Sequence, residues 1–243
     1  APLMRAAAAE GVTDVGESIH QLEAGPLRVS LTEAGTLRIG WTEPDWFGPA
    51  TFGAPGTPAA PVVTASVSRL RVEADWIFSE LRALASEPVV VVRIEALRSQ
   101  RGIGSGDFAT PAVAWHFDPG ARLENGAPDD MHAFGHQYTE FALPVFSDAA
   151  LSRWRLLPIR PAVVLPLGLV APDGRTVLLA PLTAFHEQVI GVPAGKEQAG
   201  TGLRVGWHGD VDDVAAGFST ELAIIAGDGP RDCFARWGRL LRS

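Results

Sequence analysis

Hydrophobic and polar residues alternate along most of this chain. In Leu27–Thr32, apolar residues take every second position and polar residues the positions between, which is the period of a half-buried β-strand. Other stretches repeat this pattern or form short β-branched runs such as Val89–Val92, which are typical of a buried strand. The predicted strands are Ser18–Ala24, Leu27–Thr32, Thr36–Thr42, Val62–Ser68, Arg69–Phe78, Ser79–Ala85, Val89–Ser99, Ala112–Phe117, Tyr138–Phe146, Ala162–Val170, Thr176–Leu182, Phe185–Val192, Gly202–His208 and Phe218–Ala226.

Turn signals separate these strands. Pro172–Gly174 joins the clearest hairpin, because proline sets φ and glycine tolerates positive φ. Ser79–Ala85 could instead form a helical turn, but we favour the strand. About a dozen short strands at this spacing predict an all-β antiparallel sandwich.

Helix is expected mainly at the end of the chain. Asp228–Gly229–Pro230 precedes the amphipathic segment Arg231–Arg242, and Ser147–Ser152 is predicted as a short helical turn capped by Ser147. We therefore expect two parts, a sandwich over residues 1–227 and a helical linker over residues 228–243. The linker would lead to a second domain.

Composition narrows the possible partners. A net charge of −8 with scattered arginines argues against a nucleic-acid partner, and no run of about 18 apolar residues suggests a membrane span. The single cysteine, Cys233, excludes an internal disulfide and is interpreted as a packed thiol. No signal peptide is visible, so a cytoplasmic location is expected, although a leader removed before Ala1 is compatible with the sequence. No cofactor is expected, and homo-oligomers are left open.

The segment Glu43–Pro61 is rich in glycine and proline and is predicted to be a long loop. It carries Asp45 and Trp46, a carboxylate next to an indole, a pair well suited to binding a sugar. We predict that the loop projects and presents both residues to a sugar or to a partner domain. The alternative is that its aromatic residues cap the core, as Trp41, Trp76, Trp115 and Trp207 are expected to pack inside it.

Three further groups of residues are candidates for binding a metal, binding an anion or hydrolysing a glycoside. His132 and His136, four residues apart beside Asp129 and Asp130 in the polar segment Leu123–Gly135, would bind a metal only if they shared a helical face. Backbone amides of the glycine-rich turn Gly102–Gly106 could hold an anion. A pair of carboxylates for glycoside hydrolysis would have to come from Asp118, Glu140 and Glu187. None of these groups supports the assignment of a catalytic residue, and polar-loop or surface roles are the simpler interpretation.

Three segments together resemble a known family. They are Pro161–Leu169, Thr176–Leu182, and the end of the chain from Gly217–Phe218–Ser219–Thr220–Glu221–Leu222 through Trp237–Gly238–Arg239–Leu240–Leu241. This pattern resembles the N-terminal β-supersandwich of multidomain glycoside hydrolases of the α-galactosidase and α-glucosidase kind, which have a galactose mutarotase-like sandwich before a (β/α)₈ barrel. The resemblance implies that the catalytic carboxylates lie in the barrel, that no catalytic residue belongs to this chain, and that its partners are a carbohydrate and a C-terminal catalytic domain.

Two functional hypotheses follow. The first is a non-catalytic sandwich domain that supports the barrel and contributes a loop to substrate binding. The second is a protein that acts alone, either as a carbohydrate-binding module or as a mutarotase-like epimerase. In an epimerase, His116, His186 or His208 would exchange protons, because histidine titrates near neutral pH.

Overall fold

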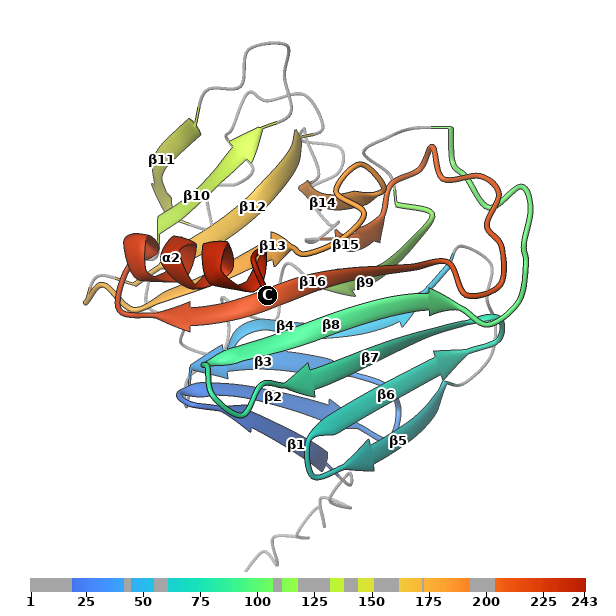
Figure 1. The fold of residues 1–243 in the computed structure, drawn as a ribbon, viewed down its shortest axis with the longest axis horizontal. Helices are drawn as coiled ribbons and strands as arrows, with labels where there is room; N and C mark the ends of the chain where they lie inside the picture. Colours follow the sequence, from blue (N-terminus) through green and yellow to red (C-terminus); the bar gives the residue numbers. More distant parts are fainter. Residues whose placement is uncertain are drawn as a thin grey trace, which may run out of the picture.

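The computed structural model describes residues 19–41, 45–54, 61–106, 111–117, 132–137, 144–150, 162–171, 173–192 and 204–243. These residues form two large β-sheets packed face to face, with one helix on the outside (Figure 1). Every strand pairing between the named strands is antiparallel. The predicted fold class, an all-β antiparallel sandwich with a C-terminal helix, is confirmed.

The first layer, called sheet A, carries the candidate site described below. Its strands are, in spatial order, β1 (Ile19–Ala24), β2 (Leu27–Thr32), β3 (Leu37–Trp41), β4 (Asp45–Gly53), β9 (Val113–Phe117), β15 (Arg204–Trp207), β14 (Gln188–Val192) and the beginning of β12 (Ala162–Val170). The second layer, sheet B, contains the end of β12, then β13 (Thr176–Pro181), β16 (Ser219–Gly227), β8 (Val89–Ala96), β7 (Ile77–Ala83), β6 (Arg69–Ala74) and β5 (Val62–Ser66). Two more strands, β10 (His132–Gln137) and β11 (Pro144–Ala150), extend sheet B beside β12.

Strand β12 belongs to both sheets. Ala162 and Val163 pair with β14 in sheet A, whereas the residues from Leu167 onward pair with β13 in sheet B. Pro166 lies between the two runs, and proline fits there because it has no N–H group to donate to a ladder. One strand thereby connects the two layers.

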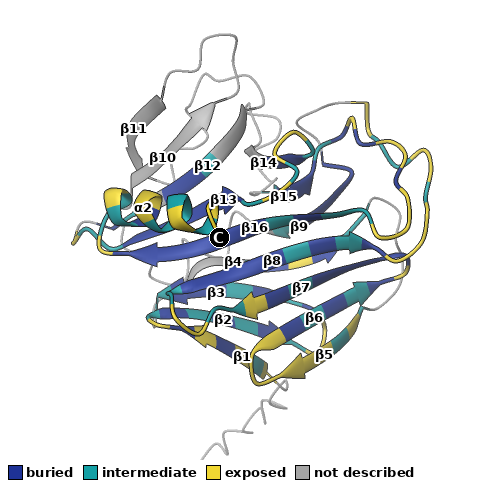
Figure 2. Cartoon of the chain, in the orientation of Figure 1, coloured by how far each residue is buried: buried dark blue, intermediate teal, exposed yellow. Residues whose placement is uncertain are grey.

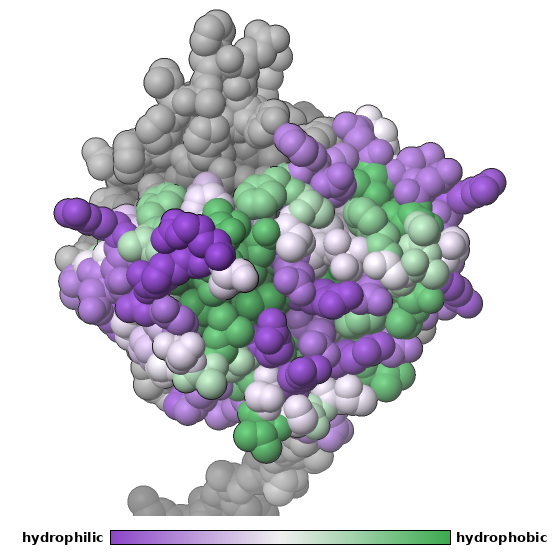
Figure 3. Space-filling model, in the orientation of Figure 1, coloured by the Kyte–Doolittle hydropathy of each residue, from purple (hydrophilic) through white to green (hydrophobic). Residues whose placement is uncertain are grey.

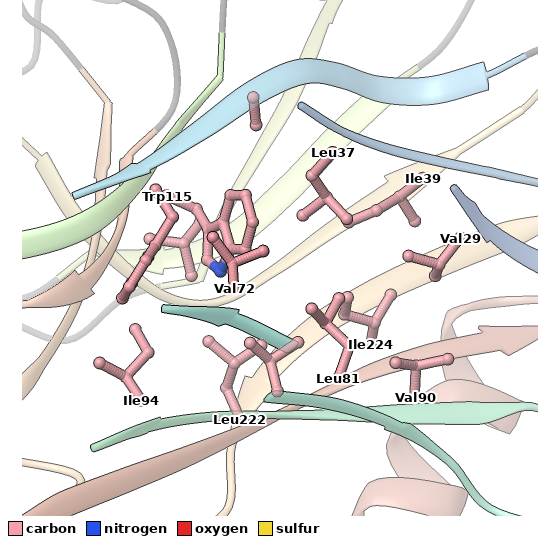
Figure 4. Close-up of a cluster of buried hydrophobic side chains, with 14 of the residues drawn as sticks. Val29, Leu37, Ile39, Val72, Leu81, Val90, Ile94, Trp115, Leu222 and Ile224 are labelled. Carbon is pink, nitrogen blue, oxygen red and sulfur yellow. The ribbon is translucent and has the colours of Figure 1, made fainter. Parts of the chain in front are cut away.

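The alternation seen in the sequence fills the space between the layers. Val29, Leu37 and Ile39 of sheet A are at most 1% exposed and face the inner residues of sheet B (Figure 4). On the sheet B side, the labelled inner residues are Val72, Leu81, Val90, Ile94, Leu222 and Ile224. Burial of alternate side chains from both sheets is the main source of stability in such a sandwich.

Helix α2 (Pro230–Leu240) covers the outer face of sheet B. Cys233, Trp237 and Leu240 are spaced as one helical face, and they pack on outward-pointing side chains of β8, β13 and β16. Those side chains are Val89, Val91, Leu178, Ala180, Ala223 and Ile225. Burial on both faces explains why the central strands of sheet B are dark blue in Figure 2, and Figure 3 shows the hydrophobic area beside the helix. The predicted helix is confirmed, whereas its role as a linker stays a prediction.

Two local predictions are wrong, and one choice between strand and helix is confirmed. Ser147–Ser152 was expected to be helical, but β11 runs through Ala150, because pairing with β10 outweighs the weak helical signal of a serine cap. Arg69–Phe78 is not one strand: Asp75 takes a φ of 54° and turns the chain between β6 and β7. Ser79–Ala83 is strand, as favoured over helix, and completes β7.

Candidate functional site

Three adjacent strands of sheet A place polar side chains in one row on its outer face. In the ladder, His116 of β9 is paired with Thr51 of β4 on one side and with Arg204 of β15 on the other. The residues next to them point into the core: Trp115 is 1% exposed and Val205 4%. Because side chains alternate along a strand, Thr51, His116 and Arg204 lie together on the opposite face. We call them the outer row.

The charge of Arg204 acts on the imidazole of His116. Burial and the nearby guanidinium both disfavour the protonated ring, so the pKa of His116 lies below its usual value. At neutral pH the ring is therefore uncharged, with one nitrogen that donates and one that accepts a hydrogen bond. Thr51 can also do both, and Arg204 supplies donors. Such a set suits a ligand rich in hydroxyl groups.

Small residues form the next row of the same face. Gly53, Ala114 and Gly206 are paired across β4, β9 and β15. Gly206 has no room for a side chain, since a Cβ there would lie 1.9 Å from the carbonyl oxygen of Val113. The backbones of β9 and β15 thus approach closely beside the outer row, and Ala114 and Gly206 are buried there.

Asp45 and Trp46 do not lie in a projecting loop. Residues 45–53 form strand β4, which pairs with β3 on one side and with β9 on the other, so this part of the loop prediction is wrong. The register with β3 shifts twice along β4, and such bulges accommodate extra residues and a proline such as Pro49 within a sheet. The side chains of Asp45 and Trp46 are outside the described part of the structure. Their role in binding stays a prediction, now placed on the strand that also carries Thr51.

The metal candidate does not form on a helix. His132 and His136 both lie in strand β10, where residues four apart are separated by about 13 Å, whereas two ligands of one zinc ion each lie about 2 Å from it. Asp129 and Asp130 lie outside the described residues. In the described part of the chain, no group of three His, Cys, Asp or Glu side chains could hold a metal ion.

The candidate acid–base residues are scattered. Asp118 and Glu140 are outside the described residues, and Glu187 lies in the turn before β14, where its carbonyl oxygen accepts a hydrogen bond from the backbone of His208. His208 follows β15 four residues after Arg204, which places it about 13 Å along the strand direction from the outer row. His186 is exposed in the same turn as Glu187. Only His116 therefore lies in the outer row.

The glycine-rich turn binds carboxylates of its own chain. The backbone N–H of Gly102 donates to Asp213 at 3.3 Å, and that of Gly104 donates to Asp212 at 3.1 Å. The capacity of these amides to hold an anion is thus used by the facing loop. The sequence suggested the donors but could not indicate acceptors more than a hundred positions away.

Cys233 is a packed thiol, as predicted. It is fully buried under α2, and burial, with the nearby Asp232, raises its pKa to about 12. The thiol therefore stays protonated and unreactive in the native state.

Comparison with known proteins gives a likeness of fold. No family model and no curated protein matches the sequence. Among solved structures, a beta-arabinopyranosidase is similar over 86% of this chain, with 10% sequence identity and a TM-score of 0.50. The chain spans 40% of the length of that protein. A galactose mutarotase-like protein from Lactobacillus casei matches 86% of this chain and 99% of its own, with 11% identity and a TM-score of 0.44.

These observations define the fold of the chain, which is an antiparallel supersandwich with a helix packed on one sheet. No helix in the described part of the chain has the length and apolar character needed to cross a membrane.

Proposed function

We propose that this chain is the β-sandwich domain of a glycoside hydrolase, where it supports a separate catalytic domain and helps to bind the sugar. The observation that carries the proposal is the likeness of fold to a beta-arabinopyranosidase of which the chain spans only 40%. In this arrangement α2 would be the connection toward the catalytic domain, and the protein would act in carbohydrate metabolism.

The chemistry of the outer row agrees with binding rather than hydrolysis. Glycoside hydrolysis uses two carboxyl groups about 5–9 Å apart across the scissile bond. Among the side chains that the structure describes, the outer row consists of a hydroxyl, an imidazole and a guanidinium. These groups recognise sugar hydroxyls without supplying a nucleophile and an acid.

Asp45 and Trp46 would contact the same sugar as the outer row. They belong to β4, a few residues from Thr51. The indole face would pack on the C–H groups of a sugar ring and the carboxylate would accept from its hydroxyls. Together with the outer row they would form one sugar-binding surface on sheet A.

Titration calorimetry with L-arabinose and D-galactose tests the proposal. We expect weak binding that Trp46→Ala and Arg204→Gln each reduce at least tenfold. Arg28→Gln is the matched control, because Arg28 lies on β2 of the same sheet and pairs with Glu23 at 3.2 Å. The purified chain should not hydrolyse nitrophenyl glycosides. Turnover that is lost when one carboxylate of this chain is substituted would contradict the non-catalytic role.

A second candidate function is that of a mutarotase-like epimerase. The neutral His116 beside the cationic Arg204 favours it, because a neutral imidazole can accept the proton of an anomeric hydroxyl. Polarimetry distinguishes the two: an epimerase accelerates the mutarotation of α-D-galactose, and His116→Asn abolishes the acceleration. A binding domain leaves the rate at that of the buffer.

A further inference from the structure

Among the residues that the structure describes, strand β5 stands at the end of sheet B and is paired on one side, with β6. It forms an antiparallel ladder with β6 and stands last in the order of strands (Figure 1). An edge strand offers a row of backbone donors and acceptors to any further strand.

The two most exposed large apolar side chains of the described residues lie at the two ends of β5. Val67, in the turn after β5, is 101% exposed, and Val62 in β5 is 62% exposed. Figure 2 shows β5 mostly in the colour of exposed residues.

The residues of β5 carry no charge, although charged residues commonly protect exposed edges. Its sequence is Val-Val-Thr-Ala-Ser, whereas the neighbouring β6 carries Arg69, Arg71 and Glu73. Val63 and Ala65 are paired with the core residues Val72 and Leu70 and so face the interior side of sheet B, yet Ala65 is exposed. The hydrophobic layer is therefore incomplete at this edge.

We propose that β5 pairs antiparallel with β5 of a second copy of this chain, around a two-fold axis at Thr64. A two-fold interface uses the same surface patch on both subunits, and β5 is complementary to itself. Only the register centred on Thr64 pairs all five residues of the strand. In that register Val63 lies opposite Ala65 of the partner subunit on the interior side.

A second copy fits this edge for two physical reasons. New backbone hydrogen bonds continue sheet B from one subunit into the other. Val63 and Ala65 from both subunits then extend the hydrophobic layer without bringing like charges together, since β5 is neutral. Thr64 meets its own copy on the outer face, where a threonine pair is favourable.

Sedimentation velocity over a range of protein concentrations tests the proposal. We expect a reversible increase to twice the monomer mass. Thr64→Lys should raise the dimer dissociation constant at least tenfold, because two lysines would lie directly opposite each other. Gln21→Lys is the matched control: it adds the same charge to the outer face of β1, the exposed strand at the other end of the sheet order, and should leave the dissociation constant within twofold.

Cross-linking provides a second readout that does not depend on a charged variant. In Thr64→Cys, the paired cysteines should form a disulfide-linked dimer under mild oxidation, whereas Gln21→Cys should not, and the native Cys233 is buried. A protein that stays monomeric at millimolar concentration would overturn the proposal. A dimer weakened equally by both lysine variants, or cross-linked equally by both cysteine variants, would also overturn it.

Discussion

Two tryptophan indoles link the sheets through the core. Trp115 of β9 donates its Nε1–H to the hydroxyl of Ser79 at 2.9 Å, and Trp207 of β15 donates to that of Thr220 at 2.9 Å. Ser79 and Thr220 are paired with the same residue, Ile94, on its two sides. A buried indole N–H without an acceptor is costly, so these hydroxyls fix the position of each ring across the sandwich.

Removal of one hydroxyl should therefore destabilise the protein without changing its shape. Thr220→Val keeps the side-chain volume but leaves the Trp207 N–H without a partner, which should cost about 1–3 kcal/mol in the free energy of unfolding. Chemical denaturation measures this loss. Thr220→Ser keeps the hydroxyl and should lose less, so equal losses in the two variants would contradict the role of the hydrogen bond.

His116 should make stability depend on pH. The pKa of His116 is lowered in the folded state by burial and by Arg204. Below about pH 6.5 the imidazole is therefore protonated to a greater extent in the unfolded chain than in the folded chain. Stability should then fall as the pH drops below 6.5 toward the folded-state pKa, and be unaffected by this group above 6.5. In His116→Gln, denaturation curves at pH 7.5 and 5.5 should differ less than in the native sequence. An unchanged difference would show that His116 does not titrate in this way.

At the scale of the elements, close contacts hold β9 against β15 and α2 against sheet B. The strands β9 and β15 approach so closely at Gly206 that a Cβ would overlap the carbonyl oxygen of Val113 at 1.9 Å. Helix α2 is fixed differently: Trp237 donates to the carbonyl oxygen of Pro181 at 2.8 Å, and Glu87, in the turn before β8, accepts from Arg236 at 2.6 Å and Arg239 at 3.2 Å. The pairing of β9 with β15 thus requires a residue without a side chain at position 206, whereas the docking of α2 depends on several side-chain contacts.

Gly206→Ala should separate β9 from β15. The backbone oxygen cannot move without breaking the ladder, so we expect a loss of about 3 kcal/mol in thermal or chemical unfolding. Gly229→Ala is the control, because nothing lies within 4 Å of a Cβ there and its φ of 165° is ordinary extended backbone. A similar loss in both variants would mean that the close approach is not the cause.

Loss of the Glu87 contacts should loosen α2. Burial raises the pKa of the Cys233 thiol to about 12, so a thiol reagent reacts only when the helix moves away. Glu87→Gln should remove about 1–2 kcal/mol of docking free energy and speed labelling about 5- to 30-fold. Glu80→Gln, on the same face of sheet B near Arg69, should leave the rate unchanged, and equal rates in both variants would contradict the proposed contact.

At the scale of the whole molecule, the central strands β8, β13 and β16 of sheet B are buried on both faces. Its inner face packs on sheet A, and its outer face is covered along β8, β13 and β16 by α2. Residues 228–243 are therefore part of the packed structure as well as a predicted linker. The sandwich predicted for residues 1–227 would expose a continuous apolar surface without them.

A chain ending at Gly227 should bind more of a hydrophobic dye and unfold at a lower temperature than the chain ending at Ser243. The reason is the exposure of the six outward side chains that α2 covers. Removal of Arg242 and Ser243 alone, both exposed, should change neither property. Equal melting temperatures for the chains ending at Gly227 and at Ser243 would show that α2 contributes nothing to the sandwich.

The sequence alone determined most strands and the terminal helix, because these depend on local periodicity. The alternation in Leu27–Thr32 and the β-branched run Val89–Val92 both became strands, and the spacing of Cys233, Trp237 and Leu240 became the packed face of α2. Burial of Trp76, Trp115 and Trp207 was also predicted, since large apolar groups inside strand patterns have nowhere else to pack.

Only the tertiary structure decided which residues meet. Residues 45–53 read as a loop because glycine and proline disfavour strands, yet pairing on both sides with β3 and β9 makes them β4. The outer row depends on register between strands far apart in the chain, and a slip of one residue would turn His116 into the core. The hydroxyl partners of the indoles and the carboxylates that hold the glycine-rich turn lie across the fold. Local patterns predict elements, whereas long-range pairing selects the neighbours that make a site.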